Sequence, residues 1–74
     1  MRELESVVPT RDIAEHGLVS GDVGAIVFVH GTEAYEVEFV SAEGSTIAVL
    51  TLAAADVRPL AGKEILHVRR LASA

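Results

Sequence analysis

Glu36 and Glu38, which flank Val37, have the spacing best suited to acid–base chemistry. Side chains two positions apart in a strand share a face and stand about 6.5–7 Å apart. Carboxylates at such a distance act in glycosidases, but that chemistry also needs a cleft and a raised pKa. Because a chain of 74 residues has little room for a cleft, we interpret the pair as a solvent-facing row with cross-strand ion pairs to Arg or Lys.

The other reactive side chains form no recognisable site. The chain has no cysteine, which excludes disulfides and thiol chemistry. The serines lie at expected turns or chain ends, where a hydroxyl caps the backbone, and none is interpreted as a nucleophile. The histidines lack a second ligand at metal-binding spacing; they are His16, His30 and His67. The sequence therefore predicts a protein that is not an enzyme, with no catalytic residue, no metal and no cofactor.

The segment Ser20-Gly21-Asp22-Val23-Gly24 predicts a tight corner, because its two glycines tolerate conformations that other residues avoid. We expect the Asp22 carboxylate to cap this turn. The β-branched and aromatic run over residues 25–29 then indicates a strand. A phosphate-binding loop would open a helix instead, so this corner is not interpreted as one.

Charge is distributed unevenly along the chain. Residues 1–56 carry ten acidic against two basic side chains, a sum of −8, whereas residues 57–74 carry four basic against one acidic, a sum of +3. The net charge of −5 argues against non-specific nucleic-acid binding. The basic strip comprises Arg58, Lys63, Arg69 and Arg70. It either pairs with the acidic part of the chain or, as the alternative, contacts nucleic acid or the ribosome.

Strand and turn signals alternate along the whole chain. We expect strands at residues 5–10, 24–29, 35–39, 46–52, 57–60 and 65–71, a long connection over 11–20 and a helical turn near 53–56. A short helix over 64–71 is the alternative for the last segment. The sequence thus predicts one all-β domain over residues 1–74, a small SH3-like barrel of five to six short antiparallel strands.

Two of these strands carry informative patterns. Residues 35–39 alternate strictly between large apolar side chains and glutamates, as in a half-buried strand. Residues 46–52 are apolar on both faces apart from their threonines. They are expected to form the central, most buried strand, unless their outer face meets a partner.

Nothing in the sequence suggests a membrane location. The first five residues contain no apolar run of the kind found in signal peptides. The longest apolar stretch, residues 47–55, is far shorter than the roughly 20 residues needed to cross a bilayer. We expect a cytoplasmic protein without a membrane partner.

Several segments resemble a family of small, free-standing bacterial proteins that is known only as a domain of unknown function. The resemblance covers nearly the whole chain, through Leu4–Val8, Asp12–Leu18, Gly21–Gly24, Ala34–Phe39 and Asp56–Pro59. It implies an SH3-like barrel and a protein partner encoded by a neighbouring gene, in an antitoxin-like or immunity-like role. The corner and strand over residues 21–27 are also loosely similar to the KOW motif of ribosomal proteins and elongation factors.

We expect the protein to bind another protein, either by strand addition at an open edge or through a patch on its surface. The patch combines the first loop with the acidic strand; its residues are Ile13, His16, Leu18, Tyr35, Glu36 and Glu38. Ile13 and Leu18 are also expected to fold back as plugs of the core. A homodimer that buries residues 46–52 or the last strand is a further alternative.

Overall fold

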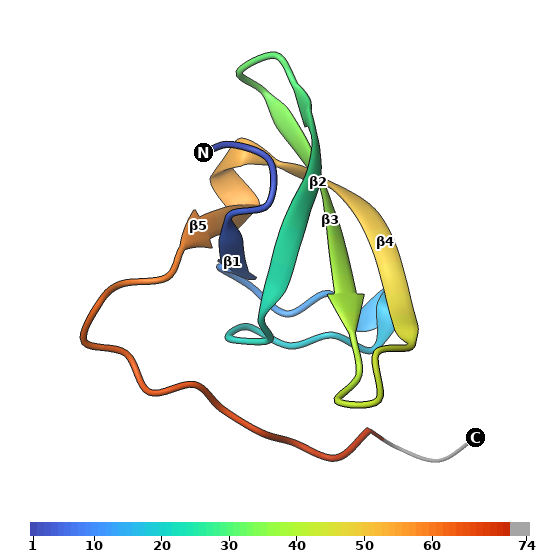
Figure 1. Cartoon of the computed structure of the whole chain (residues 1–74). Coiled ribbons are helices and arrows are strands. Elements are labelled where there is room, and N and C mark those ends of the chain that lie inside the picture. Colours follow the sequence, from blue (N-terminus) through green and yellow to red (C-terminus); the bar gives the residue numbers. More distant parts are fainter. Residues whose placement is uncertain (72–74) are drawn as a thin grey trace.

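One antiparallel sheet of five short strands organises the chain (Figure 1). The computed structural model describes residues 1–71. Its elements are β1 (Ser6–Pro9), the 3-10 turn η1 (Ala14–His16), β2 (Gly24–His30), β3 (Ala34–Val40), β4 (Thr46–Ala53), the 3-10 turn η2 (Ala54–Asp56) and β5 (Val57–Pro59). The strand order β4-β3-β2-β1-β5 leaves β4 and β5 at the two edges. The all-β fold, the long first loop and the turn near residues 53–56 are confirmed. No helix among the described residues has the length and apolar character to span a bilayer.

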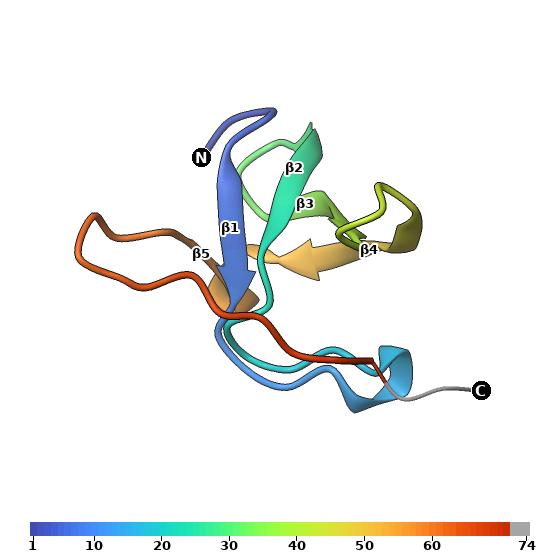
Figure 2. The same cartoon turned by 60° about the horizontal axis from the view of Figure 1, so that its bottom comes forward.

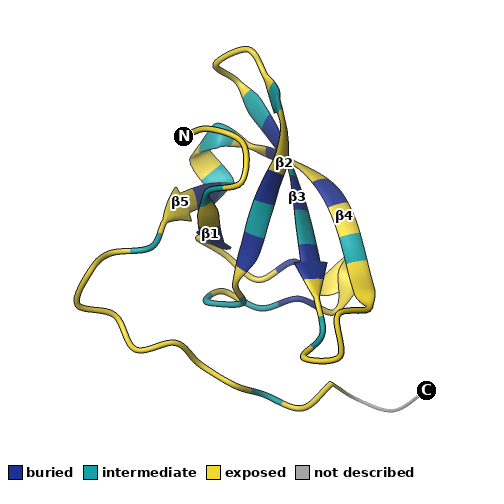
Figure 3. Cartoon of the chain, viewed as in Figure 1, coloured by how far each residue is buried: buried dark blue, intermediate teal, exposed yellow. Residues whose placement is uncertain are grey.

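The alternation of β3 places the core. Tyr35, Val37 and Phe39 are buried, while the glutamates between them are partly exposed on the opposite face. On either side, β2 contributes Ile26 and β4 contributes Leu50 to the same cluster. Buried and partly exposed residues accordingly alternate along β3 (Figure 3). The two-residue period predicted for this strand is confirmed.

Gly24 allows β2 to enter the sheet directly against the core. A Cβ at this position would stand 2.7 Å from Val37 Cγ1, 2.9 Å from Phe39 Cε1 and 3.0 Å from the Glu38 carbonyl oxygen. Real Cβ atoms do not approach other atoms this closely. The absent side chain is therefore a packing requirement, since the two β3 side chains occupy the space.

The first loop, between β1 and β2, closes on itself and plugs one end of the core. Ile13 and Leu18 exchange two backbone hydrogen bonds, of 2.9 and 3.2 Å, around the short turn η1. Gly17 ends that turn at φ 70°, a conformation that favours glycine. Both apolar side chains of this pair are buried. The prediction that they fold back as plugs is confirmed.

The prediction that residues 46–52 form the central strand is wrong. β4 pairs with β3 alone among the described residues and lies at the edge of the sheet. The chain turns away after β4 through η2, and β5 pairs with β1 instead (Figure 1). An apolar pattern on both faces is common to central strands and to edge strands that lie against something else, so it does not determine position in the sheet.

The strand expected at residues 65–71 is also absent, and so is the alternative helix over 64–71. This segment is part of a C-terminal tail, residues 60–71. The tail leaves β5 and passes beneath the sheet to the first loop (Figures 1 and 2). Ile65 is 95% exposed and Val68 93% exposed. The reason is positional: the tail is anchored at the first loop, away from both sheet edges, so its backbone has no strand to pair with.

We expect Gly24→Ala to lower the free energy of unfolding by about 1–3 kcal/mol, because the added methyl group must displace Val37 and Phe39. Urea denaturation monitored by circular dichroism measures the change. Gly62→Ala is the matched control, since no atom lies within 4 Å of its added Cβ. Equal stability of the two variants would contradict this account of the close approach.

Candidate functional site

The patch expected from the first loop and Tyr35 is not a surface. Ile13, Leu18 and Tyr35 belong to the buried core cluster, with Tyr35 only 8% exposed. Burial of these apolar side chains in the core removes them from water and stabilises the small domain. Of the loop residues singled out, only His16 is exposed. The prediction that these three side chains form a binding surface is therefore wrong.

Glu36 and Glu38 lie on the outward face of β3, as expected, but their partners differ from those expected. Glu36 Oε2 lies 3.3 Å from His30 Nε2, and Glu38 Oε2 accepts a hydrogen bond of 2.8 Å from the Thr46 hydroxyl. The His30 ring also packs edge-on against Phe28, with centroids 4.7 Å apart. No Arg or Lys pairs with either glutamate among the described residues.

The basic strip is not assembled as one surface, because carboxylates engage two of its four members separately. Arg58 binds Glu64 through two hydrogen bonds, of 3.0 and 2.5 Å. Together with the Ala61 N–H, this contact lowers the pKa of Glu64 to about 2. Lys63 and Arg70 are exposed and form no ion pair within residues 1–71. The predicted pairing of the strip with the acidic part of the chain is confirmed for Arg69. Arg58 pairs instead with Glu64, which lies in the same C-terminal part.

The most buried of these contacts joins the tail to the corner before β2. Arg69 Nε and Nη2 donate to the two Asp22 oxygens at 2.8 and 2.6 Å, and Nη2 also donates to the Gly17 carbonyl at 2.9 Å. The Arg69 side chain is 27% exposed and the Asp22 side chain 14%. The guanidinium contact, with help from the Val19 N–H, lowers the pKa of Asp22 although burial opposes it. The expected capping role of Asp22 is confirmed by that N–H bond of 2.9 Å.

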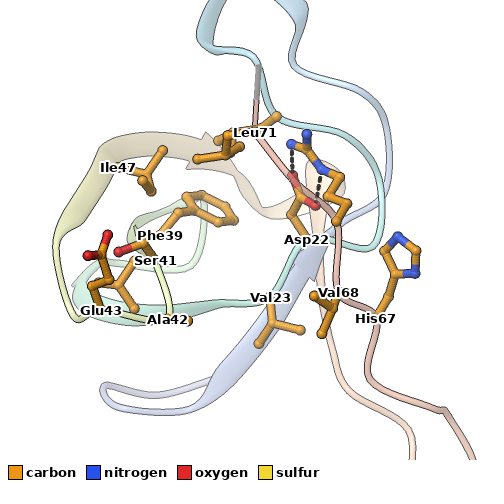
Figure 4. Close-up of a pocket in the computed structure, with 13 residues that line it drawn as sticks. Asp22, Val23, Phe39, Ser41, Ala42, Glu43, Ile47, His67, Val68 and Leu71 are labelled. Atoms are coloured by element: carbon orange, nitrogen blue, oxygen red, sulfur yellow. Dashed lines mark hydrogen bonds and ion pairs between the residues drawn. The ribbon is translucent and has the colours of Figure 1, made fainter. Parts of the chain in front are cut away.

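A groove of about 460 Å³ opens beside this ion pair, between the first loop, the β3–β4 turn and the tail. Its apolar wall includes Leu18, Val23, Phe39 and Ile47, and the tail contributes His67, Val68, Arg69 and Leu71. Leu71 lies on the side of Phe39 and Ile47, whereas Val68 lies on the side of Val23 (Figure 4). We define the Asp22 groove as Leu18, Asp22, Val23, Phe39 and Ile47.

A second candidate surface is the free edge of β4. Val49 is 49% exposed and faces outward, directly opposite Glu38 of β3. Ile47 is also exposed, and the eight residues of the strand include no charged side chain and no proline. Charged side chains and prolines usually protect sheet edges from unwanted pairing.

The comparisons identify the family. The family described as a domain of unknown function (DUF4926) matches residues 3–59. The chain belongs to this family. The expected kinship with a domain-of-unknown-function family is thereby confirmed. No curated protein and no solved structure matches the chain. The match contains all five residues of the Asp22 groove and ends at Pro59, before the tail that lies on it.

The Asp22 groove is the feature that sequence reasoning missed. Asp22 was interpreted only as a turn cap and Arg69 only as part of a strip, and 47 positions separate them. The uneven charge of the two parts of the chain was the available signal, but it does not say which acid meets which base. No group of three or more metal-binding side chains occurs within the part of the chain that the structure describes.

We expect Arg69→Gln to lower the free energy of unfolding by about 1–2 kcal/mol near neutral pH, because it leaves the Asp22 carboxylate without its charged donor. Asp22 has a folded-state pKa below its ordinary value of 3.8, so this stabilisation is complete above that value. It disappears as the pH falls further and the carboxylate takes up a proton. The deficit of the variant should therefore shrink below pH 3.8, in urea titrations repeated at several pH values.

Arg70→Gln is the matched control for this titration, because Arg70 is next to Arg69 in the chain and makes no ion pair within residues 1–71. It should cost little stability at any pH. A deficit of Arg69→Gln that stayed constant down to pH 2 would show that the contact with Asp22 is not its source.

Proposed function

We propose that the protein is a non-enzymatic interaction module of the bacterial cytoplasm, an SH3-like barrel that binds another protein by strand addition at β4. The single observation that carries the proposal is the free edge of this eight-residue strand, with apolar side chains exposed on it. An unpaired edge presents a row of backbone donors and acceptors, and an extended segment of a partner can complete it.

The side chains next to this edge suggest the character of the partner. Val49 lies opposite Glu38, and Thr51 lies opposite Glu36, so an uncharged row of side chains runs beside an acidic one. A strand that alternates apolar and basic side chains complements this surface. The sum of −8 over residues 1–56 favours basic partners over a longer range as well.

The antitoxin-like or immunity-like role is the sharpest form of the proposal. It rests on the resemblance noted above, which implies a partner encoded by a neighbouring gene. An acidic domain is suited to cover the basic surface of a nuclease-like partner, because opposite potentials accelerate association and favour the correct pairing.

We expect the neighbouring gene product to form a complex with the protein at micromolar concentration, and Val49→Lys to weaken that complex at least tenfold. A lysine on the strand places a positive charge where the proposed partner is basic and blocks edge pairing. Affinities from isothermal titration calorimetry measure both effects.

Ile65→Lys is the matched control, because it adds the same charge at an exposed apolar position of the tail. It should leave the affinity within about twofold. Absence of any complex with the wild-type protein would overturn the proposed function, and equal effects of the two lysines would overturn the assignment to β4.

A further inference from the structure

The Asp22 groove lies inside the part of the chain that the family match covers, whereas the tail segment against it, from His67 to Leu71, lies outside. The domain therefore contributes a surface of mixed apolar and acidic character, and a separate piece of the chain lies against it and forms the other wall of the groove (Figure 4).

We propose that the Asp22 groove is a binding site for extended peptide segments in which an arginine is followed, two residues later, by an aliphatic side chain. In the free protein, Arg69-Arg70-Leu71 is a resident copy of such a segment and competes with the partner. This inference does not depend on strand addition at β4, because it rests on the contacts of Asp22; the two surfaces share Ile47.

Asp22 is built to recognise a guanidinium group. The Val19 N–H donates to its Oδ2 at 2.9 Å and fixes the carboxylate, which then accepts from two nitrogens of one arginine. The Gly17 carbonyl accepts a further hydrogen bond from the same group. This arrangement of three acceptors matches the planar donor fork of arginine and not the single ammonium of lysine.

The spacing of two residues follows from the geometry of an extended chain. Successive side chains point to opposite sides, so the residues before and after Arg70 face the domain together. Arg70 itself is exposed. Leu71 is 41% exposed, compared with 93% for Val68, and it lies by the apolar wall near Phe39 and Ile47 (Figure 4).

The tail is held at Glu64, by Arg58, and at Arg69, by Asp22 and Gly17. Its apolar side chains at Ile65, Leu66 and Val68 are mostly exposed, so little packing supports the segment between Glu64 and Arg69. Attachment to the same chain nevertheless gives the tail an effective concentration in the millimolar range. A free peptide must compete against that concentration, and removing the guanidinium of the tail should open the site to it.

The test uses a fluorescein-labelled peptide with the sequence of residues 63–71, Lys-Glu-Ile-Leu-His-Val-Arg-Arg-Leu, titrated with full-length proteins by fluorescence polarisation. The Arg69→Gln protein should bind this peptide at least tenfold more tightly than the wild-type protein does. The Arg70→Gln protein should bind it as the wild type does. Equal affinities of the Arg69→Gln and wild-type proteins would overturn the proposal.

A second pair of measurements tests the recognition chemistry. A peptide with glutamine in place of the first of its two arginines should bind the Arg69→Gln protein at least tenfold more weakly, and Asp22→Asn added to that protein should have a similar effect. Retention of affinity in both cases would overturn the assignment to Asp22. It would not affect the β4 proposal, since Val49 lies outside the groove.

The wild-type protein supplies a measurement that does not depend on the folding of any variant. The Arg69 Nε–H hydrogen, bound to Asp22, should give a distinct nuclear magnetic resonance signal. A saturating concentration of the peptide should shift this signal to the position of a solvent-exposed arginine. A signal that kept its position while the peptide bound would show that the tail and the peptide do not share a site.

Discussion

The close approach at Gly24 is the constraint on which the rest of the structure depends. Because this residue has no side chain, Val37 and Phe39 extend into the space beside β2 and complete a core that contains few aromatic rings. Phe39 then has two roles. It fills the interior, and it forms part of the wall of the Asp22 groove. The shape of the candidate binding site is therefore coupled to the packing of the sheet, and a change at one is transmitted to the other through a single ring.

Electrostatics complete the arrangement. The chain keeps a large negative charge in its first 56 residues and a small positive charge in the remainder. The folded protein joins the two parts through Asp22–Arg69. A second ion pair, Arg11–Asp56, lies wholly within the first 56 residues. The first contact is partly buried and uses both carboxylate oxygens, whereas the second is a single, more exposed contact of 3.4 Å. Geometry and burial thus make the Asp22 contact the stronger anchor.

The features predictable from the sequence are those set by near neighbours. The alternation over residues 35–39 correctly separates buried from outward side chains, because a strand has a fixed two-residue period. The corner at Gly21 and Asp22 is likewise local, with Gly21 at φ 94° and the aspartate capping the turn. Ile13 and Leu18 are predicted both to plug the core and to form part of a binding patch. Their burial confirms the first prediction and contradicts the second.

The features that escaped prediction depend on distant parts of the chain. Residues 65–71 have the composition of a strand, but a strand forms only where an edge is available to pair with it. The position of β4 depends on where the chain goes afterwards, and η2 and the β1–β5 pairing decide that, not the residues of β4. The Asp22–Arg69 contact similarly joins positions 47 residues apart.

The edge position of β4 and the absence of a strand over residues 65–71 both leave apolar side chains exposed. β4 has the apolar pattern of a strand covered on both sides, and the tail has the composition of a strand. Within residues 1–71 of one copy, however, β4 keeps exposed apolar side chains and the tail forms no strand. Exposed apolar surface of this kind is costly to a small domain, which has little stability to spare. Natural edge strands without a partner usually carry lysine, proline or a bulge, and β4 has neither lysine nor proline. The β3–β4 pairing has one register shift, next to the hairpin, which leaves Ile47 of β4 as the extra residue, so the edge is regular from Ala48 onward. This edge, regular over most of its length and without charge or proline, is the feature on which the proposed strand addition at β4 rests.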